Sequence, residues 1–206
     1  MNKKTIMKIS FVAGIACFVI AIFLLIPKNE KQEPVEQVKV EDKVETKEFN
    51  YTLYDNKSDL YKEYFQELKE ELTKDIVNED EYAKILAKLF ITDFYSLEDK
   101  KTNTDIGGLD FIYEEMKENF ILKAQDTIYK NVKSNVYGDR KQSLPKVKAV
   151  EITSATKKNV SIGTAQDPLG YIVVAKVTYE KDLNYPKEIT LTLVHKDKKL
   201  YIVEVK

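Results

Sequence analysis

Residues 78–94, NEDEYAKILAKLFITDF, determine how the rest of this 206-residue chain is interpreted. Their large apolar side chains recur every three or four residues, the period of one face of an α-helix. Asn78 followed by Glu81 fits a helix N-terminus, in which a small polar cap precedes a carboxylate by three residues. The apolar stripe is wide, so the sequence predicts a helix buried at the centre of its domain. The stripe consists of Tyr82, Ile85, Leu86, Leu89, Phe90 and Phe94, flanked by Ala83, Ala87 and Ile91.

Helical periodicity continues on both sides of this stretch. Residues 58–75 carry an apolar stripe with spacings of four, three and four, which predicts an amphipathic helix. After a polar loop at residues 96–105, a third helical region is predicted at about 108–134, with a bend near Asn119. Buried positions are expected at Tyr61, Phe65, Leu68 and Leu72 in the first of these helices, and at Phe111, Met116, Phe120, Ala124, Ile128 and Val132 in the last.

The C-terminal part of the chain changes to a period of two, which is typical of strands. GYIVVAKVTYE (170–180) places Tyr171, Val173, Ala175, Val177 and Tyr179 on one face. KEITLTLVH (187–195) alternates similarly, and the turn KDKK (196–199) joins it to LYIVEVK (200–206) as a hairpin. An earlier strand is expected around KVKAVEITS (146–154), continued by NVSIG (159–163). The predicted fold class is α+β, with about three helices packed on a curved antiparallel sheet of about four strands.

The N-terminal region contains an uncharged run at residues 9–26, closed by Pro27. Eighteen helical residues span roughly 27 Å, close to the hydrocarbon core of about 30 Å. Lysines precede the run and no acid does, which favours a cytoplasmic N-terminus. The predicted organisation is a cytoplasmic tail at 1–8, a single transmembrane anchor at 9–27, a charged extracytoplasmic linker at 28–50 and an exported domain at 51–206.

Cys17, the only cysteine, raises two alternatives to an uncleaved anchor. Lipoprotein processing requires an aliphatic residue three positions before the cysteine, where this chain has Gly14. A secretory signal peptide has a shorter apolar stretch followed by small residues, whereas PKNEKQEP (27–34) follows here. We therefore favour the anchor, and whether the leader is ever cleaved stays open.

Composition excludes several classes of function. Residues 51–206 carry a net charge of −2, so the domain lacks the basic footprint of a nucleic-acid-binding protein. His195 is the only histidine, and we expect it half exposed at a strand end, although it is the one candidate for a general base. Gly107-Gly108 lacks the spacing of a nucleotide-binding loop, and Asp105 is expected to cap the helix that follows. No catalytic, cofactor-binding or metal-ligating residue is predicted, and no cofactor.

Charge is unevenly distributed along the predicted domain. Residues 58–82 contain nine acids and three lysines, whereas residues 123–148 contain seven basic residues and two acids. In one interpretation the two regions complement each other across the fold. In the other they form a dipolar surface, one end of which is attracted to anionic lipid head groups or wall polymers.

The order of a membrane anchor, a charged spacer, three helices and a terminal antiparallel sheet resembles the nuclear-transport-factor-like (cystatin-like) cone fold. In particular, it resembles the bitopic cone-domain components of bacterial conjugation and type IV secretion machines. The stretches AKLFITDFYSLEDK (87–100) and GGLDFIYEEM (107–116) also resemble exported domains of unassigned function in Gram-positive bacteria. The resemblance covers the architecture of residues 55–206 and transfers no functional residue.

The anchor and spacer, which hold one folded domain near the envelope, and the lack of a metal set or phosphate loop favour an interaction or assembly module at the cell membrane, with a protein or cell-envelope partner. Two alternatives stay open: a small-molecule-binding, sensory cone domain, and a hydrolase or isomerase that uses a cone pocket. The sequence does not decide the oligomeric state.

The predicted topology is testable with reporters. A reporter that works only outside the cytoplasm, fused after Lys206, should be active, because the lysines before the anchor hold the N-terminus inside. A reporter that works only in the cytoplasm should be inactive at the same position. The opposite pattern, or a mature chain that begins after Pro27, would contradict a single-pass anchor.

Overall fold

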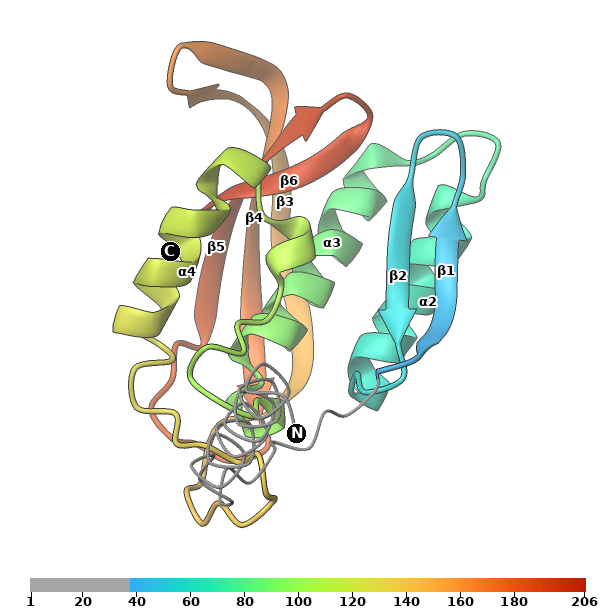
Figure 1. Ribbon diagram of the computed structural model, residues 1–206. Helices are drawn as coiled ribbons and strands as arrows, with labels where there is room; N and C mark the ends of the chain where they lie inside the picture. Colours follow the sequence, from blue (N-terminus) through green and yellow to red (C-terminus); the bar gives the residue numbers. More distant parts are fainter. Residues whose placement is uncertain (1–37) are drawn as a thin grey trace, which may run out of the picture. The chain divides into compact units, whose positions relative to one another are not determined.

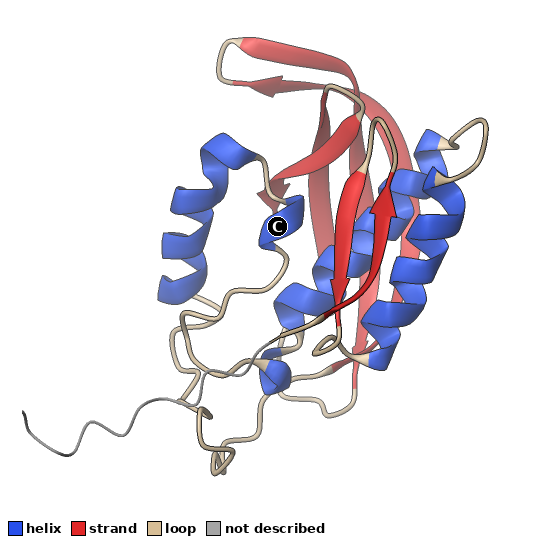
Figure 2. Cartoon of the chain, turned by 45° about the vertical axis from the view of Figure 1, so that its right-hand side comes forward, coloured by secondary structure: helices blue, strands red, loops and turns tan. Residues whose placement is uncertain are grey.

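The computed structural model describes residues 38–206, which have an α+β architecture (Figure 1). Within this part, three α-helices accompany a four-stranded antiparallel sheet, which confirms the predicted fold class. Figure 2 shows the helices and strands in a second view. No helix in residues 38–206 combines the length and apolarity needed to cross a bilayer. The predicted tail at 1–8, anchor at 9–27 and first part of the linker lie outside the described residues.

The sheet has the strand order β3-β4-β5-β6, each strand antiparallel to the next. The two expected parts of the first strand are one long strand, in which three irregularities shift the register between β3 and β4. Bulges bend strands, and Figure 1 shows the far end of this pair bending away from the rest of the sheet. The strands are β3 (Val147–Ile162), β4 (Ala165–Tyr179), β5 (Glu188–Lys196) and β6 (Lys199–Val205).

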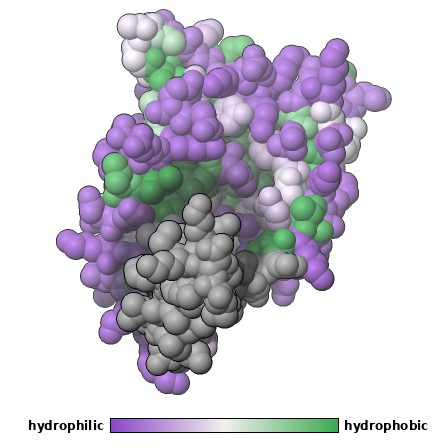
Figure 3. Space-filling model, in the orientation of Figure 1, coloured by the Kyte–Doolittle hydropathy of each residue, from purple (hydrophilic) through white to green (hydrophobic). Residues whose placement is uncertain are grey.

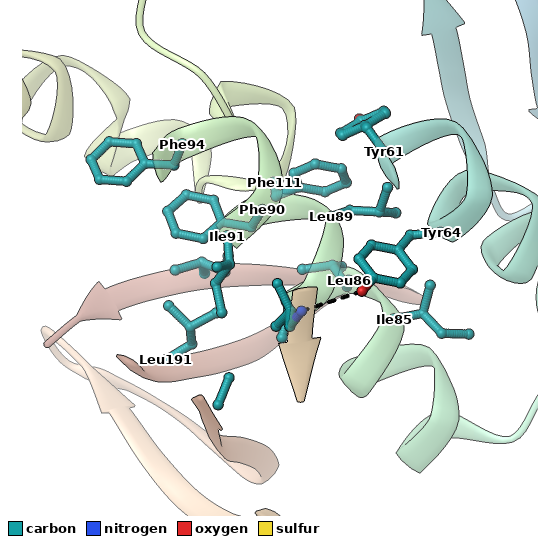
Figure 4. Close-up of a cluster of buried hydrophobic side chains, with 14 of the residues drawn as sticks. Tyr61, Tyr64, Ile85, Leu86, Leu89, Phe90, Ile91, Phe94, Phe111 and Leu191 are labelled. Atoms are coloured by element: carbon teal, nitrogen blue, oxygen red, sulfur yellow. Dashed lines mark hydrogen bonds between the residues drawn. The ribbon is translucent and has the colours of Figure 1, made fainter. Parts of the chain in front are cut away.

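Helix α3 (Glu79–Tyr95) is the centre of the core, as the sequence predicts. The side chain of Asn78 caps it, accepting hydrogen bonds from the backbone N–H groups of Asp80 (3.0 Å) and Glu81 (3.3 Å). The helix lies against β3 and β4. Figure 4 shows its side chains meeting those of the neighbouring elements. Residues of the predicted apolar stripe and of the predicted apolar face of β4 are buried: Leu86, Leu89 and Phe90 on the helix, and Val173, Ala175 and Val177 on the sheet.

Helix α2 (Asp59–Leu72) also matches its predicted stripe, with Tyr61, Phe65, Leu68 and Leu72 buried. The Ser58 hydroxyl caps it by accepting a hydrogen bond from the Tyr61 N–H. The helix packs against α3 and is also joined to the sheet. The joining contact is a hydrogen bond from the backbone N–H of Val150 to the Tyr64 hydroxyl, 3.3 Å long (Figure 4).

The predicted linker is wrong for its second half, because residues 40–50 belong to the folded domain. Strands β1 (Val40–Glu45) and β2 (Asn50–Tyr54) form an antiparallel hairpin beside α2 (Figures 1 and 2). The few apolar side chains of this hairpin are enough to hold it on the domain, because Val44 and Phe49 are both buried. Asp42 also accepts two hydrogen bonds from the Lys69 ammonium of α2, 2.7 and 2.8 Å long. The part of the predicted linker that precedes the described domain is therefore residues 28–37.

The third helical region is shorter than predicted. Only α4 (Lys117–Asp126) is an α-helix, preceded by two short 3-10 turns, η2 (Leu109–Phe111) and η3 (Glu114–Met116). The interruption arises because Ile112 forms a parallel bridge with Ile202 of β6, which requires extended backbone. The predicted bend near Asn119 is absent, since the chain breaks before α4 and α4 is continuous through that position.

Replacing Phe90 with alanine should lower the free energy of unfolding by about 3–5 kcal/mol, because it empties a fully buried site at the centre of the core. Thermal unfolding followed by circular dichroism measures the change. Leu122→Ala on α4 is the control, since Leu122 is 54% exposed and its truncation should change stability by less than about 0.5 kcal/mol. Equal melting temperatures for the Phe90 variant and the parent would show that α3 is not the core helix.

Candidate functional site

A groove of about 890 Å³ lies between α4 and the C-terminal strands. Figure 3 shows hydrophobic side chains gathered around a hollow on this side of the domain, where α4 lies in Figure 1. The groove is lined by Phe94 and Tyr95 of α3, Ile112, Met116, six residues from Asn119 to Ile128 of the α4 region, Pro186, and the consecutive residues 202–206.

The groove lies beside the face by which α4 packs on the core, where Ala124 is buried and Phe120 is partly buried. Phe120 packs on Phe94 and Phe90, with ring centroids 5.2 and 6.0 Å apart. Met116, Phe120 and Ile128 were all predicted to be buried, yet each is only partly buried, because each faces the groove. Their incomplete burial leaves a continuous apolar surface open to solvent.

Polar groups lie among the apolar lining residues. Lys123 is exposed and forms no ion pair with any acid among residues 38–206. Lys206, in contrast, pairs with Glu204 at 2.9 Å. Asn119 and Thr127 are exposed on the same helical region. The groove therefore offers an apolar surface beside one lysine, Lys123, that forms no ion pair within residues 38–206.

The two charged regions of the sequence do not neutralise each other through ion pairs within residues 38–206. Five of the nine acids of residues 58–82 pair with nearby lysines or with Lys157 of β3, which lies 3.3 Å from Glu79. No ion pair found in the described part of the chain joins residues 58–82 to residues 123–148. The basic region instead surrounds the C-terminal end of α4 and the loop that follows. Direct ion pairs between the two regions are therefore absent from the described part, and both interpretations of the charge pattern stay open.

His195 lies near the end of β5 and outside the groove. Its side chain is 19% exposed, and its Nδ1 lies 2.9 Å from a carboxylate oxygen of Asp167. The same oxygen accepts a hydrogen bond from the His195 backbone N–H at 2.6 Å. Burial alone would raise the pKa of Asp167, but its hydrogen bonds with His195 and Leu169 lower it below its ordinary value.

His195 lines a separate hollow, whose lining also includes the turn of the β1–β2 hairpin. Two threonines line this hollow, and both hydroxyls have partners elsewhere. The Thr46 hydroxyl accepts hydrogen bonds from backbone N–H groups of its own turn, and the Thr73 hydroxyl donates to the Lys69 carbonyl. Among the described hydrogen bonds of His195, none joins it to a nucleophilic side chain. The paired aspartate orients the imidazole at a strand end.

Asp93 is the centre of a buried polar cluster. Its two carboxylate oxygens lie 2.8 Å from the Lys100 ammonium and 2.7 Å from the Lys57 ammonium. Burial alone would raise the pKa of Asp93, but the charges of Lys100 and Lys57 and their hydrogen bonds hold it well below its ordinary value. An adjacent cavity of about 60 Å³ has room for water molecules only.

This cluster explains the paired glycines. The Gly108 N–H donates to Asp93 at 2.8 Å, and Gly108 has a φ of 74°, as the turn requires. A Cβ at Gly107 would lie 2.2 Å from the Asp93 carbonyl oxygen, so the close approach demands glycine. The predicted capping role of Asp105 is wrong, because its carboxylate accepts a hydrogen bond from the Lys101 N–H and the turn that follows has no side-chain cap.

Within residues 38–206, no cluster of three histidine, cysteine, aspartate or glutamate side chains could hold a metal ion. Comparison of the chain with protein-family models, with curated proteins and with solved structures gave no match. The geometry of the chain itself is therefore the basis for a functional proposal, and its most developed feature is the groove. The sequence did not predict this groove. The one sequence feature that could have indicated it is the apolar stripe of the third helical region, which extends beyond both ends of α4.

Asp93→Asn should lower the free energy of unfolding by about 3–5 kcal/mol at neutral pH, because it leaves two largely buried ammonium groups without a counter-charge. The folded-state pKa of Asp93 lies below its ordinary value of 3.8. The contribution of the Asp93 carboxylate to the free energy of unfolding is therefore complete above about pH 4 and is lost as the pH falls further. The stability gap between parent and variant should narrow below pH 4 in denaturant titrations.

Asp182→Asn provides the matched control for this measurement. Asp182 pairs with Lys187 at 2.6 Å, but both side chains are exposed, so solvent screens the interaction and little stability should be lost. Two results would contradict the stabilising role of the Asp93 ion pairs. One is a loss of stability for Asp93→Asn as small as that for Asp182→Asn, and the other is a difference from the parent that widens in acid.

Proposed function

We propose that the chain is a membrane-anchored, extracytoplasmic binding module, and that its partner binds in the groove between α4 and β6. The observation that carries this proposal is the apolar groove itself. Exposed apolar surface is unfavourable in water by about 25 cal/mol per Å², so a groove of this kind gains free energy when a partner covers it. Contiguous apolar surfaces on folded domains commonly mark interaction sites.

The length of the chain before the domain supports a role at the membrane surface. The predicted anchor ends at residue 27, and the described domain begins at residue 38. The ten residues between them span at most about 35 Å when fully extended. An anchor at 9–27 would therefore confine the domain to a thin layer next to the bilayer, which raises its effective concentration for partners located there.

The basic region supports the same placement. In Figures 1 and 2 the loop between α4 and β3 lies at the end of the domain where β1 begins, so both face the side from which the chain enters. Anionic head groups attract basic side chains by about 1 kcal/mol each near the surface. In residues 123–148, the lysines that have no ion pair within the described part are Lys123, Lys130, Lys133, Lys141 and Lys148.

A small-molecule-binding, sensory domain is the second candidate, and one observation favours it. The groove volume of about 890 Å³ falls within the range of about 300–1,000 Å³ that is typical of small-molecule sites. The bend of the β3–β4 pair is also consistent with a cone-like sheet. A hydrolase or isomerase would depend on His195, which lies outside the groove.

Site-specific photocrosslinking in cells tests the binding proposal. Asn119 and Glu118 are adjacent and exposed on α4, but only Asn119 lines the groove. A benzoylphenylalanine at position 119 should form an adduct with a membrane or envelope component, whereas the same group at position 118 should not. Filling the groove with Thr127→Trp should abolish the adduct, and His195→Ala should leave it unchanged. Equal adducts from both positions, or none, would contradict the groove as the binding site.

A further inference from the structure

We propose that the occupant of the groove is an extended peptide segment of a partner protein, which adds to the outer edge of β6 as a further strand of the sheet. This inference rests on the proposed function and specifies the class of its partner. It is carried by the course of the groove along the strand, by the backbone groups exposed there and by a pairing that the chain already makes with the same edge.

The groove follows the edge of the strand. Successive side chains of a β-strand point to opposite faces of the sheet, so a hollow over one face is lined by every second residue. Here five consecutive residues, 202–206, line the hollow. The groove therefore runs beside the backbone of β6. Because β6 is a terminal strand of the sheet, no strand within residues 38–206 lies on the outer side of this backbone beyond the bridge at Ile202.

The register with β5 identifies which backbone groups face outward. Thr190 and Lys206 exchange both backbone hydrogen bonds, 2.8 and 2.9 Å long, so they form a hydrogen-bonded pair. Such pairs alternate with non-hydrogen-bonded pairs in an antiparallel ladder. Leu191 opposite Val205 is the adjacent, non-hydrogen-bonded pair. The N–H and C=O of Val205 therefore point away from β5 and toward the groove.

The chain itself shows that this edge accepts an extended segment. Ile112 forms a parallel bridge with Ile202, and the Tyr113 N–H donates to the Ile202 carbonyl at 3.0 Å. This pairing stops at the turn Glu114–Met116, which directs the chain away into α4. An incoming peptide would continue along the same edge from about Val203 to Lys206, where four residues span about 13 Å.

The side chains that line the groove suggest the sequence of such a peptide. An added strand directs alternate side chains toward the half-buried Met116, Phe120 and Ile128, which favours apolar residues at every second position. The ammonium of Lys123, which forms no ion pair with the described residues, favours an acidic residue beside them. We therefore expect a short extended segment with alternating apolar residues and at least one acid.

Selection from a random library tests this expectation. Ten-residue peptides displayed on phage are selected against the full-length protein in lipid nanodiscs, after depletion on empty nanodiscs. Peptides with alternating apolar residues and an acid should be enriched on the parent and on Glu118→Trp. They should bind at least tenfold more weakly to Asn119→Trp, because that indole would occupy the groove. The absence of enriched peptides that depend on position 119 would overturn the inference.

Two further measurements test the backbone pairing itself. Val205→Pro removes an N–H that faces outward, so it leaves the pairing of β6 with β5 in place. This variant should weaken peptide binding at least tenfold. The control Val205→Ala, which keeps the N–H, should weaken binding less. If Val205→Pro fails to fold, synthetic peptides methylated at alternate backbone nitrogens are titrated against the parent. One of the two methylation registers should lose binding. Equal binding by both registers and the unmethylated peptide would overturn strand addition.

A fatty acid separates this inference from the proposed function. The parent chain contains no tryptophan, so the indole of Asn119→Trp is a unique reporter in the groove. If oleate quenches this indole, but not that of Glu118→Trp, and no peptide binds the parent, the groove accepts an amphiphile and the peptide inference is wrong. Failure of the proposed function is a different result, in which crosslinking at position 119 gives no adduct that depends on the groove.

Discussion

The burial of α3 on almost all sides is the constraint on which the rest of the domain depends. A helix with apolar residues around most of its circumference is stable only if other elements cover each side. The sheet covers one side through β3 and β4, and α2 covers another. The loop at Gly107-Gly108 approaches so closely that a side chain at Gly108 would clash with Phe90. The positions of these elements follow from the need to exclude water from a single helix.

Buried polar groups fix this arrangement, and tyrosine supplies most of them. Tyr64 joins α2 to β3, and Tyr82 of α3 meets the hydroxyl of Tyr51 at 2.5 Å and accepts a hydrogen bond from the backbone N–H of Leu200. Tyr129 donates to the Phe94 carbonyl and accepts from the Gly107 N–H, which holds the loop against the end of α3. An unpaired buried polar group is costly, so each such bond favours one packing over its competitors. Seven of the thirteen tyrosines are buried in this core.

The groove is the side of the core that is least completely covered. Helix α4 is only ten residues long, and it packs on the core through the buried Ala124 and through Phe120, whose ring contacts Phe90 and Phe94 of α3. A longer helix in register with the predicted stripe would have covered the edge of β6. The interruption at Ile112 thus has two effects, since it pairs the chain with β6 at one point and leaves the remainder of that edge beside an apolar hollow. The interruption at Ile112 therefore accounts both for the short α4 and for the groove in which we propose that a partner binds.

The sequence by itself determined the elements whose partners are local. The stripes of α2 and α3, the cap at Asn78 and the alternation of β4 and β5 could be predicted, because helix and strand periods are properties of neighbouring residues. The predicted anchor and its orientation come from the same kind of local pattern.

Only the tertiary structure decided the features that depend on distant partners. The β1–β2 hairpin folds because α2 and α3 cover Val44 and Phe49, residues too sparse in the sequence to indicate a strand. The third helix begins later than predicted because Ile112 meets Ile202, 90 residues along the chain. The Asp93 cluster joins lysines from two loops, and the groove forms where α4 and β6 fail to meet. Such contacts follow from the path of the whole chain, which no local pattern specifies.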